Sequence, residues 1–412
     1  MLGALCWVLM LLPAALGFAS LEEAKATHLD VIHQARRIKQ QHTGQPVTLD
    51  LHGQPPLGAR SSNLRAPFSN TTAATFYPAA FGADPTGRAD SSDAFDRCLV
   101  ALLKVNTQAR MAADIVDLGG ASIDLSGGSY AISRPVVVPI QFGNLRIFGG
   151  TLRALPNFPV TGYLIQIGGI GECQTKEGQK ACNEFVDVSD ILLDGSHIAM
   201  GCLNVSNSMG STLGPHIFAV GFVVHGIRVT GGHETMITEG WFGSCYFDQS
   251  CMSEPCKHRI DPVCNRAHGK SIGVWLDSYD NVISNIIVFI PTHIGVLVTG
   301  CGNLLTGVHT WTAGLNLYAS GIAIGSPLAL KPLLKGPQVM GFNRVVDSYL
   351  DGGSQLDLWD PQAVIVTGNL FLNSPIVLQV FTHTHTPSSL LAVFPLVPRL
   401  CLGYVCMAAF HR

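Results

Sequence analysis

A short repeat in the middle of the chain limits the possible folds more than any other feature of the sequence. The segment at 273–276 (GVWL) matches 295–298 (GVLV), and 281–286 (NVISNI) matches 303–308 (NLLTGV), both at a shift of 22 residues. These units are short and β-branched, which excludes helical repeats, and a period of this length indicates a solenoid. Similar units recur at 227–230, 320–324, 344–350, 356–358 and 364–371.

Coils of this kind stack at the strand spacing of about 4.8 Å, and their inward Val, Ile and Leu side chains form one continuous core. We therefore predict an all-β fold, a single-stranded right-handed parallel β-helix over residues 75–380. The 44 glycines and the hydrophobic fraction of 47% agree with many turns and many short buried strands.

The predicted β-helix needs a cap, because the first coil of a solenoid exposes an apolar cross-section and unpaired strand edges. A turn sequence at 84–87 (DPTG) precedes an amphipathic helical pattern that runs from about Ser92 to Val105. Serine is favoured at helix N-caps, so Ser91 or Ser92 is the expected cap residue. We expect this helix to be the N-terminal cap.

The first 74 residues precede the predicted coils. Residues 2–16 are almost wholly apolar, and Gly17 and Ala19 are small residues at the −3 and −1 positions of a cleavage after Ala19. We predict a signal peptide over 1–19, then a helical and flexible lead over 20–74, and export of the chain. Export would make the sequons at Asn70 and Asn204 candidate glycosylation sites.

Cysteine usage agrees with export. The chain has twelve cysteines, and four of them crowd the segment 245–264. Their spacings lack the paired C-x2-C pattern of zinc sites, so disulfides of undetermined connectivity are favoured over a metal site. The predicted disulfide cysteines are Cys173, Cys182, Cys245, Cys251, Cys256 and Cys264.

The C-terminal tail at 381–412 departs from the coil pattern. It lacks the period and contains no Asn or Asp. Pro387, Pro395 and Pro398 argue against a long capping helix, and two of them, with Arg399, interrupt the apolar run that a membrane span would need. We predict a poorly packed tail. The formal net charge of −3, without a basic cluster, excludes nucleic acid as the expected partner, and we expect a monomer without a membrane partner.

Several motifs resemble one known superfamily. The stretch FYPAAFGADPTGRADSSDAF at 76–95 resembles the opening motif of the pectate-lyase-like superfamily of right-handed β-helices. GGHETMITEGWFGS at 231–244 and NRVVDSYLDGG at 343–353 are similar to plant polygalacturonases of the quartet type. The resemblance covers about residues 75–380. It implies a secreted cell-wall hydrolase of the α-1,4-galacturonan of pectin, an acidic polysaccharide, acting without a metal or organic cofactor.

Glycosidic hydrolysis needs two carboxyl groups, one to protonate the leaving oxygen and one to activate water or attack. On a β-helix they must point outward from adjacent coils. The predicted catalytic residues are His233, Glu234, Asp277, Asp280 and His309. His309 falls 22 residues beyond Ile287 and is therefore expected on a neighbouring coil. A structural alternative stays open, since Asp and Asn often shape turns, and 280–281 (DN) aligns with 302–303 (GN).

Subsites for a polyanion should hold cations. Four basic residues lie together in the cysteine-rich insertion between Glu234 and Asp277, where a loop tied by disulfides would make a wall of the substrate cleft. The predicted substrate-binding residues are Lys257, Arg259, Arg266 and Lys270. The alternative of an ordinary solvated loop stays open.

Other functions remain open because the usual hydrolase motifs of polygalacturonases are absent. The Arg-Ile-Lys at 37–39 lies ahead of every coil, and the His-Gly-Ile at 225–227 lacks a preceding Gly. One alternative is a pectate or pectin lyase that acts by β-elimination, although the sequence has no obvious Asp-rich calcium cluster. The other is a non-catalytic polysaccharide-binding β-helix.

Overall fold

The computed structural model describes residues 73–105, 107–111, 114–169, 181–244, 271–289, 294–311, 320–325, 341–359, 361, 363–379 and 392–393. They belong to the second of the two compact units into which the chain divides, Thr71–Arg412. The predicted signal peptide at 1–19, the lead up to residue 72 and most of the tail at 381–412 lie outside the described residues. These boundaries stay predictions.

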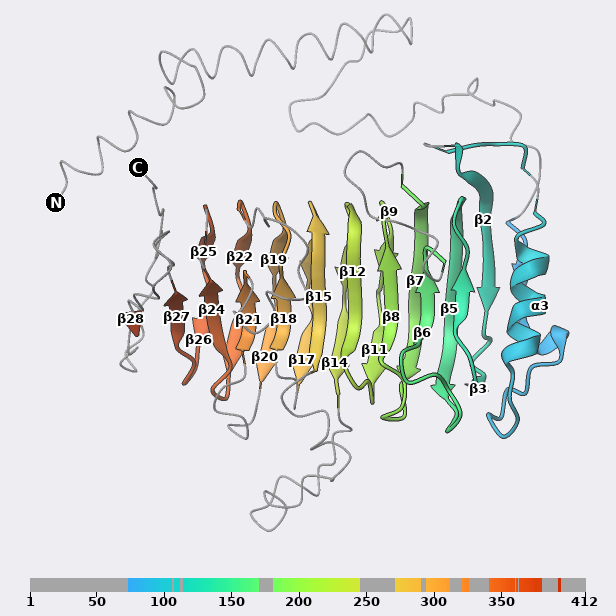
Figure 1. Ribbon diagram of the computed structural model, residues 1–412, viewed down its shortest axis with the longest axis horizontal. Helices are drawn as coiled ribbons and strands as arrows, with labels where there is room; N and C mark the ends of the chain where they lie inside the picture. Colours follow the sequence, from blue (N-terminus) through green and yellow to red (C-terminus); the bar gives the residue numbers. More distant parts are fainter. Residues whose placement is uncertain are drawn as a thin grey trace, which may run out of the picture. The chain divides into compact units, whose positions relative to one another are not determined.

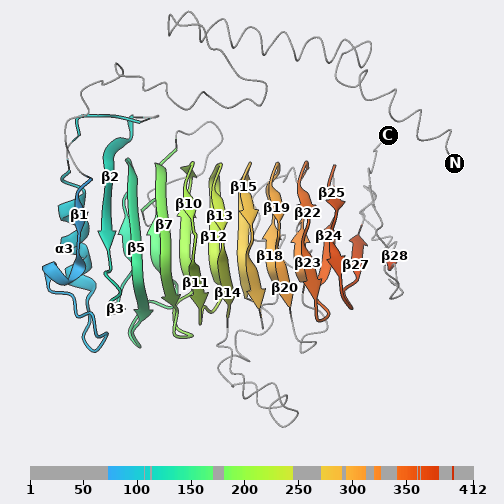
Figure 2. The same ribbon diagram turned by 180° about the vertical axis from the view of Figure 1, so that it is seen from behind.

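The described strands wind into a stack of coils (Figures 1 and 2). A complete coil contributes three short strands, and strands at the same place in successive coils pair in parallel. Among the named strands of the described residues, only β27 and β28 pair antiparallel. The stacking produces three layers of strands, which we call the first, second and third sheets. The predicted all-β parallel β-helix is confirmed.

The strands of each sheet follow one another along the stack, and two long strands, β5 and β7, run through both the second and the third sheet. The first sheet consists of β4 (Val136–Val138), β6 (Tyr163–Ile167), β8 (Gly201–Ser206), β12 (His225–His233), β15 (Ile272–Tyr279), β18 (Ile294–Val298), β21 (Ser320–Ile324), β24 (Gln355–Trp359) and β27 (Ile376–Gln379). The second consists of β2 (Val116–Asp124), β5 (Phe142–Ala154), β7 (Asn183–Asp194), β10 (Thr212–Leu213), β13 (Met236–Thr238), β16 (Val282–Ser284), β19 (Leu304–Thr306), β22 (Arg344–Val346) and β25 (Ile365–Thr367). The third adds β3 (Ser129–Ile132), β11 (Ile217–Val220), β14 (Gly240–Gly243), β17 (Ile287–Phe289), β20 (His309–Trp311), β23 (Tyr349–Asp351) and β26 (Leu370–Phe371).

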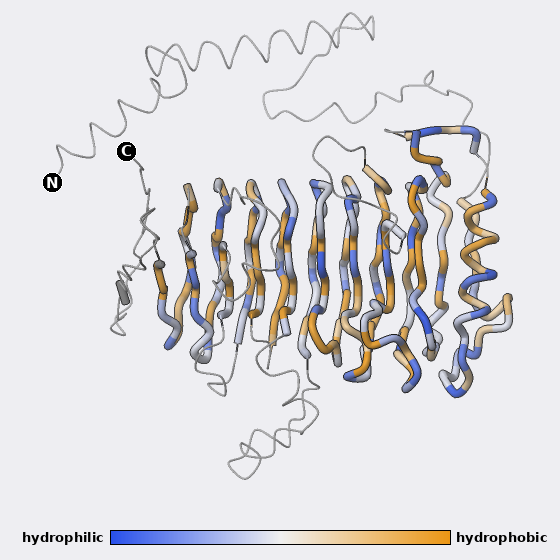
Figure 3. The backbone as a smooth tube through the Cα atoms, viewed as in Figure 1, coloured by the Kyte–Doolittle hydropathy of each residue, from blue (hydrophilic) through white to orange (hydrophobic). Residues whose placement is uncertain are grey.

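The interior of the stack is apolar. Inward side chains at the same place in successive coils, such as Val274, Val296 and Ile322, are fully buried. Figure 3 shows hydrophobic stretches recurring in strand after strand along the stack. Burial of one such side chain stabilises the fold by about 1.5–3 kcal/mol. Because every coil repeats this burial, the core holds each coil to the next.

The register of the strands reproduces the sequence repeat. Val274 pairs with Val296 in the first sheet, Val282 with Leu304 in the second, and Ile287 with His309 in the third. Each pair is separated by the predicted 22 residues. Later coils have longer connections between their strands, so Leu304 pairs with Arg344. The parallel pairing within the second sheet nevertheless continues.

A ladder of buried asparagines fixes the corner between the first and second sheets. The backbone N–H of Asn281 donates to Asn303 Oδ1 at 3.0 Å, and the backbone N–H of Asn303 donates to Asn343 Oδ1 at 3.0 Å. Their side-chain amides continue the same chain of hydrogen bonds. All three side chains are buried, so each coil's corner relies on the next coil for its hydrogen bonds.

The N-terminal end is capped as expected. The short strand β1 (Thr75–Phe76) and the 3₁₀ helix η1 (Pro78–Phe81) lead into helix α3 (Ser92–Leu102), which packs against β1 and β2. The apolar side of α3, including Phe95 and Leu102, joins the main core. No described helix is long and apolar enough to cross a membrane.

The chemistry of the cap differs from the prediction in one respect. Ser91 is the N-cap residue, but its hydroxyl accepts the N–H of Asp84 instead of a helix N–H. The carboxylate of Asp90 accepts the N–H of Ser92 at 3.0 Å. Burial alone would raise the pKa of Asp90, but hydrogen bonds from Ser133 and Ser92 outweigh it and lower that pKa. An aspartate therefore performs the capping predicted for serine.

Two further strands, β9 and β28, are short. β9 (Ser208–Met209) bridges β7 and β12 at the corner between the first and second sheets. At the C-terminal end, β28 (Ala392–Val393) pairs with β27. Two residues of the tail therefore hydrogen-bond to the last coil, while the prediction of poor packing stays untested for the rest.

Candidate active site

The outer face of the first sheet differs from the outer faces of the other two. Trp275 is 7% exposed and Leu297 0%, whereas Phe218 on the outer face of the third sheet is 40% exposed. Together with three neighbours, Trp275 and Leu297 form an apolar cluster separate from the main core. Among the described residues, the strands of the first sheet also carry buried polar side chains, including Gln166, Asn204 and His225.

A column of glycines lets the coils of the first sheet approach closely. A Cβ on Gly226, Gly273 or Gly295 would lie within 2.6 Å of a backbone oxygen on the next coil. The His-Gly-Ile at 225–227, which partly matches a hydrolase motif, therefore carries the same close-packed glycine as the repeat units at 273 and 295. Its glycine serves the packing of the coils.

Asp277, one of the predicted catalytic residues, lies beside the apolar cluster of the first sheet. It lies on β15, partly buried, on the outer face of the first sheet. The hydroxyl of Thr299 donates to Asp277 Oδ1 at 2.9 Å. The indole N–H of Trp275 in turn donates to Thr299 Oγ1 at 2.9 Å. Thr299 thus accepts a hydrogen bond from the indole and donates its own hydroxyl proton to Asp277. These two hydrogen bonds fix the carboxylate in place.

His233 and Glu234 lie on the coil before Asp277, at the corner between the first and second sheets. His233 Nδ1 is 3.4 Å from Glu234 Oε2, and both side chains are largely exposed. The backbone N–H of Glu234 donates to Tyr279 O at 3.2 Å, which places Glu234 beside the end of β15. Glu234 adopts a left-handed conformation with φ of 63°. The structure therefore brings Glu234 and Asp277 to neighbouring coils, as the sequence predicted.

Asp280 occupies the same turn position as Glu234, one coil later. Its φ is 56°, and the next members of this column of left-handed residues are Gly302 and Phe342. Asp280 Oδ1 lies against Gly302, where a Cβ would come within 2.3 Å of it. The turn alternative, derived from the alignment of 280–281 with 302–303, is thus present in the structure.

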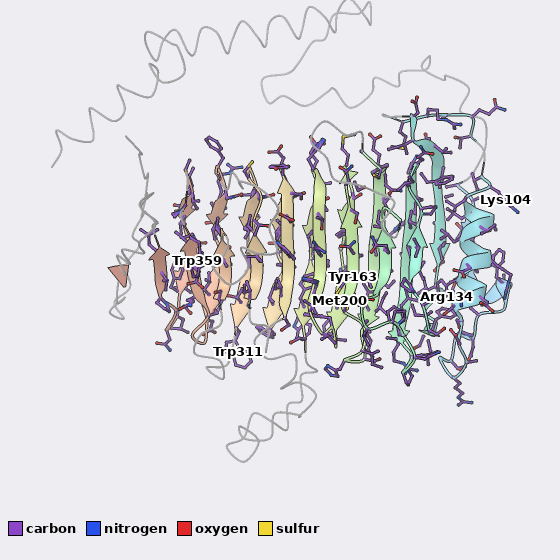
Figure 4. The ribbon with its side chains drawn as sticks, viewed as in Figure 1. Lys104, Arg134, Tyr163, Met200, Trp311 and Trp359 are labelled. Carbon is purple, nitrogen blue, oxygen red and sulfur yellow. The ribbon has the colours of Figure 1, made fainter. Side chains whose placement is uncertain are left out.

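His309 lies on a neighbouring coil of Ile287, as predicted, but on a different sheet from Asp277. It faces outward from β20 in the third sheet, where its ring stacks on Tyr349 at 4.6 Å between centroids. Burial lowers the pKa of His309, against the charge of Asp351, which raises it. Nearby Trp311 lies on the same strand (Figure 4). The structure does not bring His309 together with the other four candidates.

A group around Arg228 was missed by the sequence analysis. Arg228 on β12 pairs with Trp275 on β15, and its guanidinium carbon lies 4.6 Å from the centroid of the Trp275 ring. Tyr163, labelled in Figure 4, hydrogen-bonds His225 Nδ1 at 2.7 Å, two strands along the same face. A lone arginine among β-branched residues carries no motif, so only the strand register could have revealed its place beside Asp277.

The remaining predicted residues stand as follows. Cys182 forms a disulfide, whose partner lies outside the described residues. Asn204 is 7% exposed, and its Nδ2, the atom that would carry a glycan, donates to Gln166 Oε1 and Ser206 Oγ, both at 3.0 Å. The folded chain therefore disfavours a glycan at Asn204. Lying outside the described residues are Lys257, Arg259, Arg266, Lys270, Cys173, Cys245, Cys251, Cys256, Cys264 and Asn70.

Comparison with known proteins agrees with this fold. No protein-family model matches the chain. Polygalacturonase QRT3 of Arabidopsis thaliana is 32% identical over 303 residues, which are 72% of this chain and 56% of that relative. This likeness agrees with the resemblance to the pectate-lyase-like superfamily that the motifs indicated. The chain is similar to this plant polygalacturonase, as the motifs predicted, and it spans little more than half the length of that relative.

Two solved structures show a more distant likeness to this chain. The mannuronan C-5 epimerase AlgE6 A-module of Azotobacter vinelandii is 11% identical with a TM-score of 0.47, covering 74% of this chain and 80% of its own. A tailspike protein of E. coli bacteriophage HK620 is 12% identical with a TM-score of 0.48, covering 75% of this chain and 51% of its own. At these scores the likenesses carry no argument about function.

Proposed function

We propose that the protein is a secreted hydrolase of the α-1,4-galacturonan of pectin, with Asp277 and Glu234 as its two catalytic carboxyl groups. The observation that carries the proposal is the outward carboxylate of Asp277, fixed by Thr299 and, through it, by Trp275. The identity to a polygalacturonase over 72% of the chain supports the substrate class.

The two carboxyl groups have different surroundings, which suits different roles. Thr299 donates a hydrogen bond to Asp277 and holds its carboxylate in place, so we assign Asp277 as the base that takes a proton from water. That water attacks the anomeric carbon while the glycosidic C–O bond breaks. Glu234, exposed at the corner, gives its proton to the leaving oxygen. One water is consumed, and one new reducing end appears.

Glu234 lies beside Tyr279, which follows Asp277 by two residues on β15. Asp280 is assigned to the turn, because its carboxylate lies against Gly302, and His309 is assigned to the third sheet.

The experiment that tests the function is incubation of the purified protein with polygalacturonate, following reducing ends and ultraviolet absorbance together. We expect reducing ends without new absorbance, which means hydrolysis. New absorbance from an unsaturated product would mean β-elimination and would overturn the proposal. Binding without either product would mean a non-catalytic polysaccharide-binding protein and would equally overturn it.

Glu234→Gln is expected to lower the hydrolysis rate by about 10²–10⁴-fold, the usual contribution of a general acid. The substitution removes an ionisable group at nearly constant volume, so folding should be unchanged. The measurement is the rate of reducing-end formation, with far-ultraviolet circular dichroism as the check on folding.

Glu239→Gln is the matched control. Glu239 is also a left-handed corner residue beside a histidine, with Oε2 at 3.8 Å from His216 Nε2, but it lies between the second and third sheets. It should keep the parental rate. Equal rates for Glu234→Gln and the parent would show that Glu234 only shapes its turn.

The cysteine-rich insertion completes the proposal. Lys257, Arg259, Arg266 and Lys270 are proposed to line the substrate cleft, in a loop closed by disulfides among Cys245, Cys251, Cys256 and Cys264. This assignment rests on the sequence, since the insertion separates Glu234 from Asp277 in the chain. Each cation would attract the substrate's carboxylates.

Export is a further part of the proposal. Cleavage after Ala19 should leave Ser20 as the mature N-terminus, and Cys173 should pair with Cys182, which is disulfide-bonded. N-terminal sequencing and peptide mapping of secreted material check both points. Met1 at the N-terminus, or free thiols at both cysteines, would contradict the expectation.

A further inference from the structure

Arg228 is a partly buried cation whose charge is not balanced by a carboxylate among the described residues. Its Nε is buried and has no hydrogen-bond partner. Asp277 lies on the same outer face, one strand along, yet the two form no ion pair. The other outward arginine stacked on a ring, Arg146, is paired with Asp187 and Asp190. A partly buried charge without a partner is costly, so an unpaired arginine here calls for a ligand.

The neighbours of Arg228 hold it in place without neutralising it. One face of its guanidinium lies over the Trp275 ring at 4.6 Å. Tyr163 is close enough for Arg228's charge and hydrogen bonding to act on it, although burial is the larger effect and raises the pKa of Tyr163 to about 12. Burial, and then the charge of Arg228, lowers the pKa of His225 to about 3. Tyr163 and His225 are thus neutral, and Arg228 carries the only charge of the group.

The guanidinium of Arg228 matches the chemistry of a carboxylate. A guanidinium presents its N–H groups in a fork that fits a carboxylate bidentately, and stacking on an aromatic ring orients that fork. Arg228 pairs with Trp275, which precedes Asp277 by two residues on the same outward side. Arg228 and Asp277 therefore extend from adjacent strands of the same outer face, offset by two residues along the strand.

We propose that Arg228, oriented by Trp275 and Tyr163, binds the free carboxylate of a galacturonate unit next to the bond that is cut. This inference rests on the proposed function, and it specifies whether the bound sugar carries a free carboxylate or a methyl ester. The subsite prefers galacturonate over its methyl ester, because an ester has no charge and one fewer strong acceptor oxygen for the fork. Asp277 stays unpaired with Arg228 and remains available as the base.

A binding measurement tests this inference separately from the proposed hydrolysis, because it does not depend on cleavage. The experiment measures the affinity of oligogalacturonate, and of its fully methyl-esterified form, by titration calorimetry on the Asp277→Asn protein, which retains the binding face. Arg228→Gln on that background should weaken oligogalacturonate binding by about 10- to 100-fold, the loss expected for a charge-assisted hydrogen bond. Binding of the ester should change less than about 3-fold, since the substitution removes no charge-assisted bond to it.

Two further variants keep the test decisive. Arg228→Lys keeps the charge but loses the fork, so it should bind oligogalacturonate more weakly than the parent and more tightly than Arg228→Gln. Arg146→Gln, which removes an arginine stacked on Phe148 but paired with carboxylates, should leave both affinities unchanged. Equal losses for acid and ester, or no loss for Arg228→Gln, would overturn the inference. If the parent binds but does not cleave, the hydrolase proposal fails and this binding site stands.

Discussion

Asp277→Asn is expected to lower kcat on polygalacturonate by about 10²–10⁴-fold, because it removes the base that activates water. Asparagine has nearly the same shape, and its amide oxygen can still accept the hydroxyl of Thr299, which bonds Asp277 at 2.9 Å. The Trp275–Thr299 hydrogen bond is also retained. The fold should therefore be unchanged, and the loss should appear in kcat. Initial rates of reducing-end formation over a range of substrate concentrations measure it.

The matched control for Asp277 is Asp347→Asn. Asp347 is a left-handed turn residue with its Oδ1 against Gly368, at the corner between the second and third sheets. It lies away from the outer face of the first sheet, so kcat should remain that of the parent. A parental kcat in the Asp277→Asn protein would remove Asp277 from the mechanism and leave the Trp275–Thr299 pair as a purely structural feature.

The fold was predictable because the inward positions of successive coils carry the same types of side chain, which produces the sequence repeat. Each coil must present Val, Ile or Leu at the same places, so the 22-residue shift seen at 274 and 296 is a direct record of strand register. The asparagines at 281 and 303 are preserved for a related reason, since each supplies hydrogen bonds to its neighbour. The capping helix followed from the need to cover the first coil.

The candidate site was less predictable because outward side chains do not repeat from coil to coil. Periodicity in the sequence therefore does not reveal which of them lie together. Glu234 was predicted from the GGHET motif and Asp277 from a turn on one of the next two coils, and the structure places them on neighbouring coils. His309 satisfied the same 22-residue rule, but the rule does not say which sheet a residue belongs to. Arg228 needed the pairing with Trp275, which crosses the 26-residue segment 245–270 and therefore leaves no short-range signal.

Asn303→Ala is expected to lower the free energy of unfolding by about 2–5 kcal/mol, because it leaves several buried polar groups without partners. Asn303 Oδ1 accepts both the backbone N–H and the Nδ2 of Asn281, at 3.0 and 2.7 Å. Its own amide donates to Asn343 Oδ1 at 3.1 Å. All three asparagines are fully buried, so water cannot replace the lost hydrogen bonds. Urea unfolding followed by circular dichroism measures the change.

Asn369→Ala tests whether burial in the ladder, and not asparagine at a corner, is what matters. Asn369 accepts the N–H of Ser348 at 2.8 Å and donates to Val345 O at 2.9 Å, but it is only partly buried near the end of the stack. Water can reach its partners, so the loss should be about 1 kcal/mol. Because coils interact mainly with their neighbours, Asn303→Ala should also speed hydrogen exchange at 282–284 and 344–346 more than at 145–154. Equal destabilisation by the two variants, or uniform exchange, would mean that the ladder does not couple successive coils.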